Sequence, residues 1–128
     1  MKRIFLDANV LFATARKPGK TLHRIITSKK AEFVTCSYAA MEAERNLEAV
    51  DRPQLKRLLA SVQLVPDAFG APPPGVSLRG KDIPILSSAA LCGADILVTS
   101  DSRDFKHLFG LTLGGVKIVA TEDLPDEL

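Results

Sequence analysis

The sequence predicts an α/β fold, a three-layer α/β/α sandwich around a mostly parallel, five-stranded sheet. Two observations support this prediction. Five short runs rich in β-branched and apolar residues have the character of buried strands. Helical patterns lie between most of these runs. Strands that alternate with helices are joined by right-handed crossovers, so the strands lie parallel and helices cover both faces of the sheet.

The strand assignments follow from the positions of the apolar runs. Each run has the short length that is usual for a strand in a globular protein. In chain order, the predicted strands are Arg3–Leu6, Glu32–Cys36, residues 62–65, Ile96–Thr99 and Val116–Ala120.

The helix assignments follow from helical spacing and from the residues that interrupt it. Pro18 and Gly19 separate the first two helices, because neither residue favours a helix interior. The predicted helices are residues 9–16, 20–28, 38–50, 53–60 and 84–92. The third helix has an apolar stripe that is predicted to be core, formed by Ala40, Ala43, Leu47 and Val50.

One long irregular segment precedes the last predicted helix. Residues 67–81 contain three consecutive prolines, 72–74, with flanking glycines. Such a run cannot continue a helix or a central strand. We therefore expect a surface loop that delivers the chain to Asp82.

The composition indicates one globular domain, residues 1–128. Hydrophobic residues make up 46% of the chain and charged residues 25%, which suffices for a single core. No apolar run approaches the roughly eighteen residues of a membrane span, and the N-terminus lacks the pattern of a signal peptide. Cys36 and Cys92 are far apart among apolar neighbours, so we expect small buried hydrophobes rather than a disulfide or a thiolate metal site. A cytoplasmic protein is expected.

The charge is unevenly distributed. The formal net charge is +2, although four acidic side chains lie in the last seven residues. Two interpretations of an early basic cluster remain open: a solvated helix face, or a surface that attracts phosphates. The cluster consists of Arg16, Lys17, Lys20, Arg24, Lys29 and Lys30.

Five carboxylates lie where predicted strands end or predicted helices begin. Asp7 ends the first strand, and Glu42 lies early in the helix after the second strand. Asp82 opens the helix before the fourth strand, and Asp101 and Asp104 follow that strand. Parallel strands end at one edge of a sheet. If the first and fourth strands are neighbours, the strand order reverses between them, and ligand crevices form at such points.

Each acid also has an ordinary structural explanation, and this alternative stays open. Asp7, Asp82 and Asp101 can each cap a helix N-terminus, and "DSRD" reads as a weak capping box. Glu42 can be an ordinary exposed acid on a helix.

Converging carboxylates need compensating charge. Two like charges about 4 Å apart repel by about 4 kcal/mol at an effective dielectric constant of about 20. His107, expected at the surface, is the only histidine near these acids in sequence, and Arg103 is the only adjacent arginine. Oxygen ligands without cysteine or histidine favour Mg²⁺ or Mn²⁺.

Several motifs together resemble those of the PIN-domain nucleases, in order and spacing along nearly the whole chain: "IFLDANVLF", "TCSYAAMEAERNL", "KDIPILSSAALCGADILVTSD" and "SRDF". The resemblance implies a PIN-like fold and a metal-dependent ribonuclease, and many members are toxins of the VapC type, held in check by an antitoxin. The family's site falls on the acids Asp7, Glu42, Asp82 and Asp101, the more variable acid Asp104 and the hydroxyl residue Thr99.

We therefore predict an endoribonuclease that depends on Mg²⁺ or Mn²⁺, with Asp7, Glu42, Asp82 and Asp101 as its catalytic acids. The predicted metal ligands are Asp7, Asp82, Asp101 and Asp104, and Glu42 is either a further ligand or the group that orients the attacking water. RNA, an antitoxin protein and a second copy of the chain are the expected partners, and no membrane is. The predicted contacts to RNA phosphates are Arg103, Lys106, Lys20 and Arg24.

Two alternatives stand beside this prediction. The first is a PIN-like domain that binds nucleic acid or an antitoxin without catalysing turnover. The second is a metal-dependent phosphatase, which is less favoured because Asn9 stands where an Asp-x-Asp pair needs its second aspartate.

Glu42 and Glu44 compete for one role in the predicted site. Residues two apart lie about 200° from each other around a helix, so both cannot face one metal ion. The helix leaves directly from the end of the second strand, which favours Glu42 because it is the nearer of the two. The resemblance favours Glu42 as well.

Overall fold

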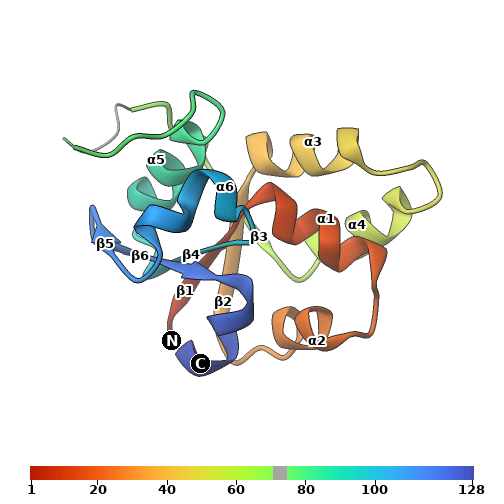
Figure 1. Ribbon diagram of the computed structural model, residues 1–128. Coiled ribbons are helices and arrows are strands. Elements are labelled where there is room, and N and C mark those ends of the chain that lie inside the picture. Colours follow the sequence, from red (N-terminus) through yellow and green to blue (C-terminus); the bar gives the residue numbers. More distant parts are fainter. Residues whose placement is uncertain (71–74) are drawn as a thin grey trace.

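The strands form one mostly parallel sheet that is wider than predicted. In the computed structural model, which describes residues 1–70 and 75–128, six strands pair in the order β3-β2-β1-β4-β6-β5 (Figure 1). The strands are β1 (Arg3–Leu6), β2 (Glu32–Cys36), β3 (Gln63–Val65), β4 (Ile96–Thr99), β5 (Thr112–Leu113) and β6 (Val116–Ala120). Four predicted strands have their predicted bounds, and β3 starts one residue later.

Helices occupy the connections between the strands. All five predicted helices are present, and their ends lie within one residue of the prediction, except that α3 ends four residues early. The α-helices of the described residues are α1 (Ala8–Arg16), α2 (Thr21–Thr27), α3 (Ser37–Asn46), α4 (Arg52–Leu59), α5 (Ile83–Leu91) and α6 (Ser102–Phe105). The 3-10 helices are η1 (Lys106–Leu108) and η2 (Thr121–Glu127).

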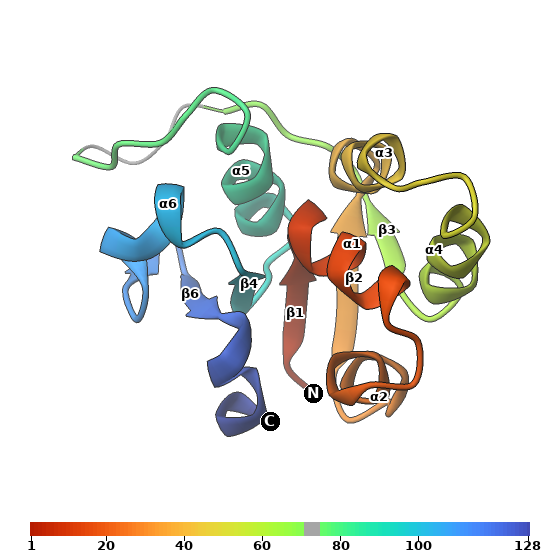
Figure 2. The ribbon, with the colours of Figure 1, turned by 45° about the vertical axis from the view of Figure 1, so that its right-hand side comes forward.

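The first strand lies at the point where the strand order reverses. β1 pairs in parallel with β2 on one side and with β4 on the other, and Phe5 lies opposite both Val34 and Leu97. The arrowheads of β1, β2 and β3 point the same way, toward α3 and the segment before α5 (Figure 2). The predicted neighbourhood of the first and fourth strands is confirmed, and the residues that follow them meet at one edge.

The prediction of five strands is wrong by one strand. β5 has only two residues and pairs antiparallel with β6, with Thr112 opposite Lys117 and Leu113 opposite Val116. Gly114 and Gly115 join the two strands with φ angles of 57° and 83°. A two-residue hairpin loop with positive φ at both positions favours glycine, so the Gly-Gly pair was the available sequence signal.

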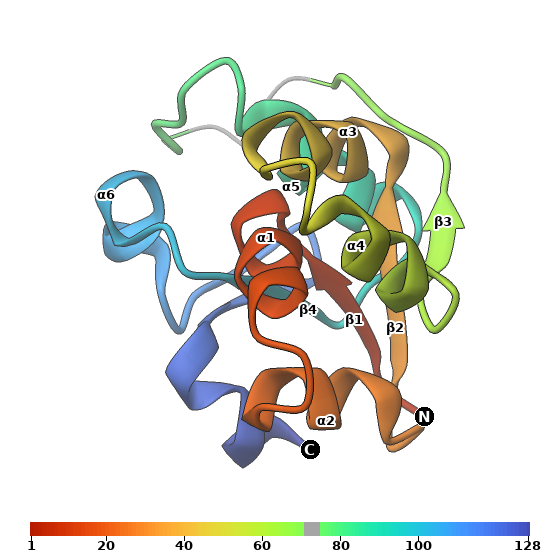
Figure 3. The same cartoon turned by 90° about the vertical axis from the view of Figure 1, so that its right-hand side faces the viewer.

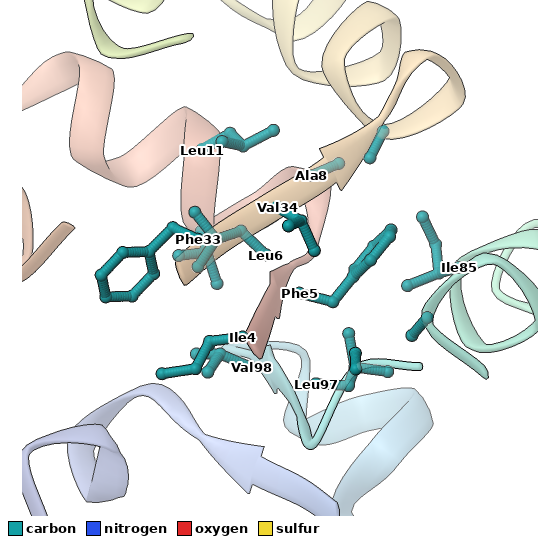
Figure 4. Packing of buried hydrophobic residues seen from close by; sticks show 14 of the residues in the cluster. Ile4, Phe5, Leu6, Ala8, Leu11, Phe33, Val34, Ile85, Leu97 and Val98 are labelled. Carbon is teal, nitrogen blue, oxygen red and sulfur yellow. The ribbon is translucent and has the colours of Figure 1, made fainter. Parts of the chain in front are cut away.

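The core lies on both faces of β1. Ile4, Phe5 and Leu6 are fully buried. The Phe5 ring points toward Ile85 of α5, whereas Leu11 of α1 lies on the other side of the strand (Figure 4). Side chains alternate between the faces of a strand, so this apolar run fills the space under helices on both sides. The third layer of the predicted sandwich is therefore present.

The predicted core stripe of the third helix is wrong at its C-terminal end. Val50 is 77% exposed, because α3 ends at Asn46 and Leu47 has extended backbone angles, φ −81° and ψ 144°. Ala39 is fully buried, whereas Ala40 is half-buried. Ala43 and Leu47 are buried as predicted.

The described parts of the predicted loop, residues 67–70 and 75–81, contain no helix or strand, as expected. The three prolines lie outside the described residues. Two serines of α5 hold the first part of the loop: Ser88 Oγ accepts a hydrogen bond from the Ala68 backbone N–H, and Ser87 Oγ donates to the Gly70 carbonyl. The loop therefore starts from a fixed position on the sheet edge.

Both cysteines are free thiols. Cys36 is buried, whereas Cys92 is half-buried and thus less enclosed than predicted. Within residues 1–70 and 75–128, no helix combines the length and apolar character needed to cross a membrane.

The end of α3 can be tested by two truncations that the sequence pattern treats alike. Leu47→Ala is expected to lower the free energy of unfolding by about 2–5 kcal/mol, because it leaves a cavity in the core. Val50→Ala is expected to change it by less than about 0.5 kcal/mol, because Val50 is exposed. Urea denaturation followed by circular dichroism measures both. An equal loss of unfolding free energy in the two variants would indicate that α3 continues to Val50, as the sequence pattern predicted.

Candidate metal centre

Asp7 is a buried carboxylate at the end of β1. Its side chain is 3% exposed, and Oδ1 accepts a hydrogen bond of 2.6 Å from the Ala8 backbone N–H. Oδ2 accepts hydrogen bonds from Thr99 Oγ1 at 2.8 Å and from Asn9 Nδ2 at 3.3 Å. Burial raises the pKa of Asp7 to about 6, although the bonds from Thr99 and Ala8 oppose this shift.

Thr99 and Asn9 connect the ends of β1 and β4. Thr99 is fully buried, and its Oγ1 also accepts hydrogen bonds from Asn9 Nδ2 at 3.2 Å and from the Asp101 backbone N–H at 3.1 Å. Asn9 Oδ1 accepts a hydrogen bond from the Ser100 backbone N–H at 3.0 Å. The turn that follows β4 is therefore held by groups at the end of β1.

Three carboxylates come together beside this connection. Asp82, Asp101 and Asp104 each offer an oxygen atom, and these atoms lie within 4.8 Å of one another. When these carboxylates are ionised, Asp82 Oδ2 and Asp104 Oδ2 are buried without a hydrogen-bond donor among residues 1–70 and 75–128. Buried oxygens without donors are costly, so this group needs a proton or a cation.

In the absence of a metal ion, a proton on Asp82 relieves part of the repulsion. Burial, together with the neighbouring Asp104, raises the pKa of Asp82 to about 8. A hydrogen bond from the protonated Asp82 holds the pKa of Asp104 below its usual value, and the nearby Arg79 and Lys81 act in the same direction.

The structure also tests the capping roles considered for these acids. Asp7 and Asp101 both accept a backbone N–H at a helix start, Asp7 from Ala8 and Asp101 from Asp104 at 3.0 Å. Asp82 makes no such bond. The capping box is not formed, because the Asp101 N–H donates to Thr99 instead of to Asp104. Capping therefore explains two of the acids in part and leaves Asp82 without a structural role.

A cavity of about 390 Å³ joins the strand ends to α3, and we call it the acidic cavity. Glu42 and Asn46 of α3 line it, so Glu42 faces the other acids. Glu44 lines a separate cavity next to α4. The lining residues of the acidic cavity are Asp7, Ala8, Asn9, Phe12, Glu42, Asn46, Lys81, Asp82, Ser100 and Asp101.

Two basic side chains from the segment before α5 compensate the acids, and sequence reasoning missed both. Arg79 Nε lies 3.2 Å from Asp104 Oδ1. Lys81 Nζ lies 3.7 Å from Asp104 Oδ2 and 4.0 Å from Asp101 Oδ2. Arg103 was expected to be the only arginine next to these acids, and this expectation is wrong because Arg79 pairs with Asp104. The sequence did contain a signal for these two residues. Arg79 and Lys81 lie within three positions of Asp82, so their backbone must lie near the site.

The predicted phosphate contacts lie in two different places. Arg103 and Lys106 are exposed beside Asp104, on and directly after α6. Lys20 and Arg24 lie at and on α2, which is at the opposite end of the sheet from α3 and α5, near the N-terminus (Figure 3). The fold does not bring Lys20 and Arg24 to the acidic cavity.

The donor set fits a hard divalent cation. Three carboxylates of the group supply oxygen only, and two of their oxygens lack hydrogen-bond donors among the described residues. Mg²⁺ and Mn²⁺ prefer such ligands and commonly keep several waters. Asp82, Asp101 and Asp104 form the tight group, whereas Asp7 lines the same cavity with both oxygens already hydrogen-bonded.

The sequence matches no protein-family model and no curated protein. The fold, in contrast, is similar to a solved structure, that of VapBC2 from Rickettsia felis bound to a DNA fragment from their promoter. The superposition has a TM-score of 0.66 and covers 92% of this chain and 98% of that chain. The sequences are 15% identical, so the similarity establishes the shared fold and nothing finer.

The raised pKa values predict that the metal-free protein loses stability as pH rises. Asp7 and Asp82 titrate near 3.8 when unfolded and near 6 and 8 when folded, so the native state binds their protons more tightly. The stabilisation is complete below about pH 4 and is lost as pH rises to 8. The slope is at most about 1.4 kcal/mol per pH unit for each proton.

Urea denaturation in EDTA across this pH range measures the slope. Asp82→Asn is expected to flatten it between pH 7 and 8, above the pH range in which Asp7 loses most of its protons. Stability that stays level or rises toward pH 8 in the wild-type protein would contradict the assignment of a proton to Asp82.

Proposed function

We propose that this protein is an endoribonuclease that hydrolyses RNA phosphodiester bonds with Mg²⁺ or Mn²⁺. The supporting observation is the acidic cavity, in which Asp7, Glu42, Asp82 and Asp101 from four separate segments face one space. Beside this cavity, Asp82 and Asp104 each have a buried carboxylate oxygen without a hydrogen-bond donor among the described residues, which agrees with a cation between them. The resemblance to the PIN-domain nucleases and the shared fold agree with this proposal.

Each acid has a defined part in the proposed reaction. Asp82, Asp101 and Asp104 would hold the ion. Asp7, at the end of β1, would add a further negative charge that attracts the ion to the site. When bound, the ion supplies Lewis-acid stabilisation of the phosphate charge and an activated water. Glu42 faces the same space from α3 and would orient that water and accept its proton.

Thr99 and Asn9 act as positioning residues in this proposal. Their hydrogen bonds fix the rotamer of Asp7 and the backbone at Asp101. Because these hydrogen bonds already hold the carboxylates in place, less conformational entropy is lost when the ion and the substrate bind.

The partners are also part of the proposal. A protein antitoxin and a homodimer are suggested by the resemblance to VapC-type toxins, and one chain of the VapBC2 structure shares the fold of this protein. RNA is the proposed substrate because exposed arginine and lysine side chains flank the acidic cavity on the α6 side.

One observation favours a domain that binds without turnover. Arg79 and Lys81 already compensate Asp104 and Asp101, so a stable state exists without a metal ion. Incubation of the purified protein with structured RNA separates the two functions. Cleavage with Mn²⁺ that stops in EDTA supports the nuclease. RNA binding without cleavage by the folded protein on every RNA tested would favour the binding domain.

Metal binding should be visible without any substrate. At a Mn²⁺ concentration about 100 times Kd, the native state gains about 2.7 kcal/mol, which raises Tm by several degrees. Asp101→Asn is expected to abolish this response, because Asp101 belongs to the tight group. Asp7→Asn is expected to retain part of it. Differential scanning calorimetry measures both variants, and an unchanged Mn²⁺ response in Asp101→Asn would remove that residue from the ligand set.

Glu42 and Glu44 form a matched pair for testing the reaction. Glu42→Gln is expected to lower metal-dependent RNA cleavage by about 100-fold or more, the usual effect of losing a positioned general base. Glu44→Gln is expected to keep most of the activity, because it lines a separate cavity. Cleavage rates with Mn²⁺ in excess measure both. An inactive Glu44→Gln beside an active Glu42→Gln would move the site to the other face of α3.

A further inference from the structure

A second cavity lies directly beside the metal centre. It has a volume of about 280 Å³, close to the lower end of the range for ligand pockets. Asp104 belongs to its lining, whereas Asp82 and Asp101 line the acidic cavity. The three-carboxylate group therefore separates the two spaces. We call the second cavity the basic hollow, and its lining residues are Ser77, Leu78, Arg79, Arg103, Asp104 and His107.

The chemistry of the basic hollow suits a phosphate group. Two guanidinium groups, Arg79 and Arg103, come from different segments of the chain and border the same space. A guanidinium group presents a planar set of donors that matches phosphate oxygens, and Ser77 and His107 add further polar groups. Arg103 forms no ion pair with any residue in the described part of the chain, so its charge is available to a ligand.

Arg79 belongs to both the basic hollow and the metal centre. Its Nε is paired with Asp104 Oδ1 at 3.2 Å, and its side chain is 56% exposed. The Asp104 side chain is only 7% exposed, so the arginine is the partner that is open to water and can leave when another cation takes its place on the carboxylate. When Asp104 serves a cation as a ligand, Arg79 loses its partner and can turn its donors into the basic hollow.

We propose that the basic hollow binds a phosphate of a single-stranded polynucleotide next to the metal centre, and that Arg79 couples this binding to metal binding. The proposal rests on the nuclease function in assigning a polynucleotide as the ligand. The coupling is reciprocal: a metal ion frees Arg79 for phosphate, and bound phosphate removes a competing cation from Asp104. Arg103 contributes to the hollow without taking part in this exchange.

The test uses a short fluorescein-labelled oligothymidylate, with fluorescence anisotropy in EDTA and in Mn²⁺ and a gel to confirm that the probe stays intact. Arg103→Gln is expected to weaken binding about fivefold in both conditions, the worth of one exposed charged contact. It should also lower the slope of log Kd against log salt by about one. Arg57→Gln on α4 removes the same charge away from both cavities and serves as the matched control.

Arg79→Gln has a different expected signature. It should weaken binding by less than twofold in EDTA and about fivefold in Mn²⁺, because the ion pair with Asp104 holds the Arg79 side chain until the metal ion takes that carboxylate. Mn²⁺ itself, titrated by calorimetry without the oligonucleotide, should bind about twofold to fivefold more tightly, because no guanidinium competes for Asp104.

Two results would overturn the proposal. One is wild-type oligonucleotide affinity in Arg103→Gln, and the other is an unchanged Mn²⁺ effect on oligonucleotide binding in Arg79→Gln. Neither result touches the nuclease function, which is measured separately by RNA cleavage with the wild-type protein. Conversely, the expected binding signatures without RNA cleavage would keep the basic hollow and reject the nuclease. Circular dichroism checks that each variant is folded.

Discussion

The site depends on the hydrogen bond between Thr99 and Asp7 across the seam between β1 and β4. Both residues are buried, so the carboxylate has lost its hydration and needs fixed donors. Thr99 supplies one, and its oxygen also accepts the Asp101 N–H. A single buried hydroxyl thereby sets the distance between two acids that are 94 positions apart in sequence. Without this seam, Asp7 and Asp101 would belong to unrelated helix starts.

Much of this arrangement could be predicted from the sequence because it follows from strong local signals. The uninterrupted apolar runs set the bounds of β1, β2, β4 and β6, and parallel pairing then brings the residues after them to one edge. β5 was missed because two residues give no periodicity. The end of α3 was missed because Val50 continues the helical spacing by chance, while the backbone leaves the helix at Leu47.

The charge compensation of the site could not be predicted, for a different reason. Arg79 and Lys81 lie in a segment without regular secondary structure, so no period indicates where their side chains point. Short-range geometry only brings them near Asp82. Their pairing with Asp101 and Asp104 depends on how α6 packs beside the start of α5, which is a tertiary property. Lys20 and Arg24 are a different case, because they lie at and on α2, a helix that the sequence predicted, while their place at the far end of the sheet was not predicted.

The acids and the basic side chains that compensate them come from different kinds of segment, and this difference determines which side chains would move when a cation binds. Asp82 directly precedes α5 and Asp101 directly precedes α6, and Asp7 is held by three hydrogen bonds. The compensating cations instead come from exposed side chains of an irregular segment. A divalent ion can therefore replace the proton on Asp82 and the ammonium and guanidinium groups without moving a strand. Exchange at exposed side chains costs little, and the acids remain where the β1–β4 seam holds them.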